Sequence, residues 1–130
     1  MSGKEIEVIL LRQLATYLAM PIFIVDPTGA LVFYNESAER ILGRRFEETG
    51  EMSATEWGME WRPSDDDGTP IPPEKLPLSV ALAQRQPAHG RFWIRGLDNV
   101  PRYIEAHAFP LTGQADRFLG AVAITWEVGR

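Results

Sequence analysis

The spacing of apolar residues predicts an amphipathic helix over residues 4–19. At about 100° per residue, one broad face of this helix collects most of its large apolar side chains. A face this wide has two interpretations: a helix that only covers its own sheet, and a helix that also contacts a second copy of the chain. Pro21 is expected to end the helix. The face consists of Ile6, Ile9, Leu10, Leu14, Tyr17 and Leu18, with Leu11 at its margin.

Short apolar runs then predict a β-hairpin over residues 21–35, with a Pro-Thr-Gly turn at 27–29. Asn35 or Ser37 is expected to cap a short helix that ends at Gly43. The periodicity is weak over the next thirty residues, which predicts short helical turns and a long loop. Beyond them the pattern predicts a helix over 76–86 and three strands over 90–96, 101–111 and 118–128.

This order of elements predicts an α+β fold. Its five-stranded, mostly antiparallel sheet carries the inserted short helices on one face. Residues 1–20 are expected to form an N-terminal amphipathic flanking helix, and residues 21–130 the core domain.

Side chains alternate across a strand, so the last three strands can each be divided between two faces. One face is small and uncharged; the other is larger and mixed, and includes Val122, Ile124 and Trp126. Small residues on a buried face either let a helix pack closely or leave a cavity that holds a ligand. The larger face needs a cover, for which the helix over 4–19 is the candidate.

Composition narrows the classes of function. The 130 residues carry a net charge of −5 without a basic run, which argues against nucleic acid as the main partner. No apolar run reaches the ~20 residues of a membrane span, and the acidic start does not resemble a secretory signal. The absence of cysteine removes disulfides, thiolate catalysis and Cys-bound zinc, and the cytoplasm is the expected compartment.

Few residues suggest catalysis or metal binding. His89 is placed in a turn, and His107 on the mixed face of a strand beside Glu105, where the two side chains could form a weak acid–base pair. No spacing of histidines is typical of a metal site. The aspartates at 65–67 before Gly68 do not match a calcium loop and predict a solvated turn. We therefore predict no catalytic residue and no metal ligand.

Three segments together resemble a bacterial sensory PAS (Per-Arnt-Sim) domain. They are PIFIVDPTGALVFYNESAERILG at 21–43, DGTPIPPEKLPLSVALAQRQP at 67–87 and RYIEAHAFPLTGQADRFLGAVAITWEV at 102–128. The family often closes with Asp-Ile-Thr before an output helix, whereas this chain has Glu127, Val128 and Gly129. That departure is typical either of an excised input domain or of a protein without a covalent effector.

The resemblance implies a ligand pocket between the inner sheet face and the inserted helices. The flavin photochemistry of light-oxygen-voltage domains needs a cysteine, and haem-binding relatives carry a histidine on the long helix, so neither cofactor is supported. An unidentified small apolar ligand, with Thr125 as one polar contact, is the expectation. The implied pocket residues are Phe23, Val25, Trp57, Trp61, Leu78, Leu82, Phe92, Ile94, Ile104, Ala106, Ala108, Ala123 and Thr125.

The expected function is a non-enzymatic sensory module of the kind found in bacterial two-component signalling. Binding of a ligand or partner would shift the sheet, and a homodimer would transmit the shift to an effector domain or protein. The dimer interface is expected at Ile6, Ile9, Leu10, Leu14 and Tyr17. One alternative is a closed-core interaction module without a ligand. Another is a small α+β cavity enzyme, which the lack of ionisable residues on the inner face disfavours.

Overall fold

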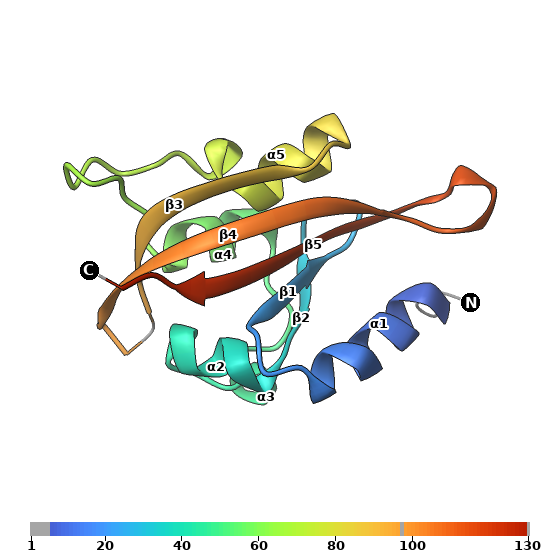
Figure 1. The fold of residues 1–130 in the computed structure, drawn as a ribbon, viewed down its shortest axis with the longest axis horizontal. Helices are drawn as coiled ribbons and strands as arrows, with labels where there is room; N and C mark the ends of the chain where they lie inside the picture. Colours follow the sequence, from blue (N-terminus) through green and yellow to red (C-terminus); the bar gives the residue numbers. More distant parts are fainter. Residues whose placement is uncertain (1–5, 97, 130) are drawn as a thin grey trace.

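A computed structural model describes residues 6–96 and 98–129, which fold around one five-stranded antiparallel sheet (Figure 1). The strands lie in the order β2-β1-β5-β4-β3, so β5 joins the first hairpin to β4 and β3. The predicted α+β fold is confirmed. Its elements are α1 (Ile6–Tyr17), β1 (Ile22–Val25), β2 (Leu31–Tyr34), α2 (Glu36–Leu42), α3 (Phe46–Thr49), α4 (Ala54–Glu60), the 3-10 turn η1 (Pro73–Lys75), α5 (Pro77–Gln84), β3 (Ala88–Arg95), β4 (Pro101–Thr112), the 3-10 turn η2 (Gln114–Asp116) and β5 (Phe118–Glu127).

The predicted hairpin at 21–35 is formed by β1 and β2, which pair antiparallel. Asp26 shapes its turn, because Oδ1 accepts hydrogen bonds from the backbone N–H of Thr28 at 2.8 Å and of Ala30 at 3.1 Å. Gly29 has a φ of +89°, a left-handed conformation that costs glycine little. The Pro-Thr-Gly signal was therefore sufficient to predict the turn.

Asn35, rather than Ser37, caps α2: its side chain accepts from the backbone N–H of Ala38. Gly43 ends the helix in the left-handed conformation, as expected. Asn35 also donates to the carbonyl oxygens of Ala15 and Met20, at 2.9 Å each. These bonds hold the chain after α1, which ends at Tyr17, two residues before the predicted end at residue 19.

The inner face of the sheet packs against the inserted helices. The small face predicted from strand alternation is buried as expected, with its alanines on β4 and β5 at 4% exposure or less. The opposing side chains come from α2, α4 and α5. Figure 1 shows α4 and α5 gathered beside β3 and β4, while α1 lies apart. The main core is therefore a layer between these helices and the sheet.

The outer face is only partly covered. Val8, Leu11 and Ala15 of α1 pack on a second cluster that includes Ile24 and Val122. Helix α1 thus covers part of the larger face, as expected, but not with the broad apolar face that the sequence singled out. Two residues of the predicted helix over 4–19, at positions 4 and 5, lie outside the described residues.

Helix α5 spans Pro77–Gln84 within the predicted 76–86, and Pro77 occupies its first turn. His89 does not lie in a turn, because β3 begins at Ala88 and pairs His89 with His107 of β4. The segment over 44–75 consists of short helices and loops, as predicted. Within the described residues, no helix has the length and apolar character needed to cross a bilayer.

Candidate ligand-binding cavity

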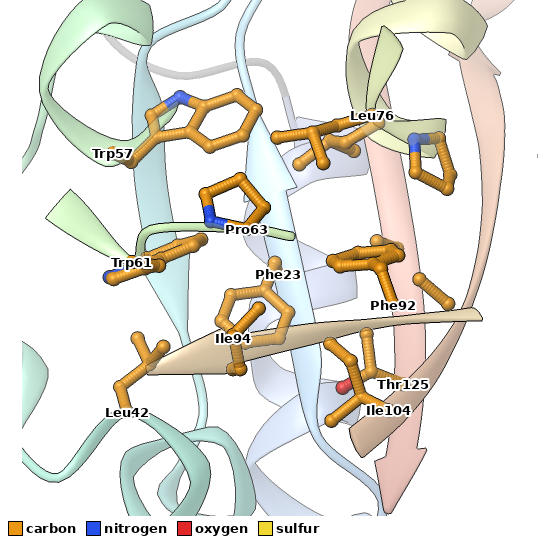
Figure 2. Close-up of a pocket in the computed structure, with 14 residues that line it drawn as sticks. Phe23, Leu42, Trp57, Trp61, Pro63, Leu76, Phe92, Ile94, Ile104 and Thr125 are labelled. Atoms are coloured by element: carbon orange, nitrogen blue, oxygen red, sulfur yellow. The ribbon is translucent and has the colours of Figure 1, made fainter. Parts of the chain in front are cut away.

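A cavity of about 50 Å³ lies between the inner sheet face and the inserted helices (Figure 2). Its walls come from every strand except β2, from α2, α4 and α5, and from the loops between the helices. None of the described residues that line it carries an ionisable side chain. The lining residues are Phe23, Leu42, Trp57, Trp61, Pro63, Leu76, Pro77, Leu78, Phe92, Ile94, Ile104, Ala106, Ala123 and Thr125.

Most of the pocket residues expected from sequence lie in this lining. Three of the expected residues lie elsewhere: Val25, Leu82 and Ala108. Val25 and Leu82 pack near the turn of the first hairpin, where Leu82 lies beside Gly29. Ala108 is buried opposite Ala88 and Ala123 and is not part of the cavity lining. For Ala108, strand alternation therefore predicted the side of the sheet correctly but not the position along the cavity; Val25 and Leu82 had been implied by the family resemblance.

Four lining residues were not expected: Leu42, Pro63, Leu76 and Pro77. Leu42 is the last residue of α2, just before the glycine that ends the helix. As an apolar residue at the end of a predicted helix, it could have been assigned to the core from sequence. The other three lie in the weakly periodic segment or at the start of α5. Local sequence carries no signal for them, because the path of a loop over the sheet decides their position.

Aromatic rings form one wall of the cavity. Trp61 contacts Phe23 and Trp57, with ring centroids 5.5 Å and 5.7 Å apart. The indole N–H of Trp57 donates to the carbonyl oxygen of Gly29 at 2.8 Å, which ties α4 to the turn of the first hairpin. This wall is therefore held by ring packing and by one buried hydrogen bond.

Two polar side-chain atoms of lining residues are buried without a hydrogen-bond partner among the described residues. They are Oγ1 of Thr125, a residue 3% exposed, and Nε1 of Trp61, a residue 8% exposed. A buried polar group without a partner destabilises a fold by about 1–3 kcal/mol. Two side chains beside the cavity thus have hydrogen-bonding capacity that the described residues do not use.

The size of the cavity limits what enters without rearrangement. Pockets for drug-sized ligands measure about 300–1,000 Å³, against about 50 Å³ here. The small inner-face residues therefore let the helices pack closely and leave only a small void. A larger molecule requires side chains to move.

A polar cluster lies on the opposite, outer face of the sheet. The Glu105 carboxylate accepts from Arg91 Nε at 2.7 Å and lies 2.6 Å from His107 Nε2. These hydrogen bonds, that of His107 first, hold the pKa of Glu105 below its ordinary value, and Glu105 raises the pKa of Arg91. A carboxylate stabilised in its ionised form is a weak base, so the cluster does not favour proton abstraction.

His107 also stacks on two rings, with centroids 5.3 Å from His89 and 5.1 Å from Trp126. The sequence predicted that a helix or a partner covers this face. Helix α1 covers only the part around Ile24 and Val122, and the His107 side chain is 45% exposed. The apolar cavity therefore contains neither His107 nor an acidic side chain. Among the described residues, no group of three or more acidic or histidine side chains could hold a metal ion.

The broad apolar face of α1 points away from the sheet. Exposed fractions run from 43% at Ile9 to 86% at Tyr17. Ile6, Leu10 and Leu14 lie between these values. A contiguous apolar surface of this kind is typical of an interaction site.

Comparison with known families found a match to the model of the PAS domain over residues 9–77, more than half of the chain. The matched region runs from α1 to the first residue of α5, and so includes the first hairpin and the helices α2, α3 and α4. No curated protein matches the chain.

Solved PAS structures share the fold at low sequence identity. The PAS domain of BvgS from Bordetella pertussis superposes with a TM-score of 0.70 at 14% identity, covering 97% of this chain and 89% of that one. The PAS domain of nitrogen regulation protein NR(II) from Vibrio parahaemolyticus superposes with a TM-score of 0.65 at 18% identity. The match covers 92% of this chain and 98% of that one. A LOV protein from Rhodobacter sphaeroides superposes with a TM-score of 0.73 at 15% identity. The match covers 97% of this chain and 70% of that one.

Proposed function

The chain belongs to the PAS domain family, and from this premise we propose that it is a sensory module that binds a small apolar ligand and signals through self-association. The observation that carries the proposal is the cavity lined by apolar and aromatic residues between the sheet and the inserted helices. The fold itself implies a sensory or signalling role. The ligand, the dimer and the effector are the parts that we propose.

Ligand binding is supported by the chemistry of the lining. Apolar walls with a buried, unused hydroxyl are suited to a mostly apolar molecule. We propose no enzymatic reaction, since the described residues that line the cavity include no acid–base pair. The likeness to a LOV protein supports the fold alone, and the cysteine that flavin adduct chemistry would need does not occur in this sequence.

Native mass spectrometry of the purified protein, beside the same sample after denaturation, tests ligand binding. We expect an additional mass that is present only in the native sample, because the ligand is held without a covalent bond. Extraction of that sample identifies the molecule. A native mass equal to that of the bare chain would instead support a closed-core interaction module, the alternative that the small cavity volume favours.

A homodimer through α1 is supported by the exposed apolar face of that helix. Both charged side chains of the described helix have partners within the chain: Glu7 pairs with Arg117, and Arg12 lies over the ring of Phe33. Two copies can therefore meet through the exposed apolar side chains with little burial of like charges. Its 12 residues span about 18 Å. A standard interface uses about 20–30 residues on each side, so we expect a weak dimer that depends on protein concentration.

Sedimentation velocity over a range of protein concentrations tests the dimer. We expect Leu10→Glu and Leu14→Glu to give folded monomers, because a charge at the centre of the interface would be desolvated. Gln84→Glu, on the exposed side of α5, is the matched control and should leave association unchanged. A monomeric wild-type chain, or glutamate variants that still dimerise, would reject α1 as the interface.

In a complete pathway the module would pass its state to an effector domain or a separate protein. Support comes from the PAS domains of similar fold, one of which belongs to a nitrogen regulation protein. The cysteine-free composition supports the cytoplasm as the compartment.

A further inference from the structure

We propose that the cavity selects an uncharged, mainly apolar molecule, no larger than about one ring, that carries a single hydrogen-bonding atom, and that Thr125 Oγ1 binds this atom. The proposal rests on the proposed ligand-binding function and specifies the chemistry of the ligand. It also assigns to Thr125 a role in specificity rather than in folding.

Thr125 lies on the inner face of β5, opposite Ala106 of β4. Its backbone N–H donates to the carbonyl oxygen of Pro21 at 2.9 Å, so this main-chain group already has a hydrogen-bond partner. The hydroxyl has no such partner within the described residues, although the residue is only 3% exposed. In Figure 2 the Thr125 oxygen is the one oxygen among the lining side chains, and it is turned toward the interior of their ring.

The other polar atoms of the lining are not available to a ligand in the same way. Trp57 Nε1 is already bonded to the Gly29 carbonyl oxygen. Trp61 Nε1 has no partner, but Figure 2 shows it on the side of the ring that faces away from the cavity. The lining prolines have no N–H. Among the side-chain polar atoms of the described lining residues, Thr125 Oγ1 is therefore the one that a ligand can reach, and it comes within reach only when lining side chains move, because the cavity wall as it stands is apolar. A second polar group on the ligand would be buried without a partner.

The lining also limits charge and size. A charged group would be desolvated among aromatic and aliphatic side chains with no counter-ion in the lining. The cavity of about 50 Å³ is smaller than the roughly 150 Å³ cavity that accepts benzene in another protein. One ring enters only if lining side chains such as Phe92 and Leu76 move aside, and a larger molecule would require the helices to separate.

Phenol and toluene are suitable probes, because they match in size and differ in one hydroxyl group. We would titrate each into the 15N-labelled protein and follow the backbone amide resonances. Both probes should shift the amides of Ala106, Ala123 and Thr125. Toluene is more hydrophobic than phenol, and this difference alone makes their affinities unequal. We would therefore compare the ratio of the two dissociation constants between the wild type and each variant.

Thr125→Val removes the hydroxyl and keeps the β-branched shape. We expect this variant to bind phenol about three- to tenfold more weakly, which is the contribution of one hydrogen bond, while its affinity for toluene stays unchanged. Thr125→Ser keeps the hydroxyl and should retain the wild-type ratio. Thermal unfolding of each variant shows that it is folded; Thr125→Val should be no less stable than wild type, because it loses only an unpartnered hydroxyl.

The outcomes separate this inference from the function on which it rests. If both probes bind but Thr125→Val leaves their ratio unchanged, the role of Thr125 is overturned and the cavity remains a ligand site. If neither probe shifts the cavity amides, both this inference and the proposed ligand binding are overturned. Shifts confined to other parts of the protein would have the same meaning.

Discussion

Asn35 links three segments through one buried amide. Its oxygen accepts from the N–H of Ile22 and of Ala38, and its nitrogen donates to the carbonyls of Ala15 and Met20. We predict that Asn35→Ala lowers the free energy of unfolding by about 3–5 kcal/mol, because it leaves several buried backbone groups without partners. Urea unfolding measures the loss.

The matched control is Glu36→Gln at the next position. Glu36 is exposed, and its 3.9 Å ion pair with Arg40 is also in solvent. Such a pair contributes little, so the stability should change by less than about 0.5 kcal/mol. An Asn35→Ala variant as stable as this control would contradict the role given to the amide.

Glu105 provides a second prediction at the scale of the residue. Its hydrogen bonds from His107 and Arg91 lower its pKa in the folded state below the ordinary 4.5. The stabilisation from this carboxylate is therefore present above the unfolded pKa and is lost as the pH falls below about 4.5, through the lower folded pKa. NMR titration of the carboxyl carbon gives the folded value directly.

His107→Phe keeps an aromatic ring next to Trp126 and removes the hydrogen bond to Glu105. We expect the pKa of Glu105 to rise toward its ordinary value in this variant. It should remain somewhat below that value, because the hydrogen bond from Arg91 still lowers it. An unchanged pKa would mean that His107 does not stabilise the carboxylate in solution.

At the scale of the elements, Gly120 lets β5 run close against β1. Its φ is +128°, and a Cβ at this position would collide with the carbonyl oxygen of Val25. We predict that Gly120→Ala lowers stability by about 3 kcal/mol or more, or prevents folding, because the clash is with backbone that pairs β1 to β5.

Gly129→Ala is the corresponding control, since nothing lies within 4 Å of a Cβ there. Its melting temperature should equal that of the wild type. Soluble yield and thermal unfolding compare the two alanine variants. A folded Gly120→Ala chain with the same melting temperature as the control would contradict the prediction. It would show that β1 and β5 can move apart at this point without loss of stability.

At the scale of the whole molecule, α1 is part of the fold and not a detachable appendage. Val8 and Ala15 cover Ile24, Val32 and Val122 on the outer sheet face. We predict that a chain beginning at residue 18 is less stable, tends to aggregate and binds a hydrophobic dye, because this cluster becomes exposed. Dye fluorescence and thermal unfolding measure the effect.

A pair of point variants tests the same prediction within the full chain. Val8→Glu places a charge in the cluster and should lower the melting temperature strongly. Leu10→Glu lies on the exposed side of the helix and should leave the melting temperature of the dilute protein nearly unchanged. Equal effects of the two substitutions would show that α1 is not docked as described.

Much of the fold followed from local sequence. Helical periodicity, the Pro-Thr-Gly turn, the Asn35 cap and strand alternation each depend on residues close together in the chain. They were sufficient to predict the five strands, the inserted helices and the small inner face. Because side-chain direction alternates along any strand, even the wall of the cavity on the sheet side was largely predictable from sequence.

The tertiary structure decided what depends on distant parts of the chain. The register of β3, β4 and β5 stacks His89, His107 and Trp126 and leaves Ala108 outside the cavity lining. The loop paths bring Pro63 and Leu76 to the lining. Packing across the sheet also selected which face of α1 is buried: the narrow, small-residue face of Val8 and Ala15 allows close contact, and the bulkier apolar face is left to solvent.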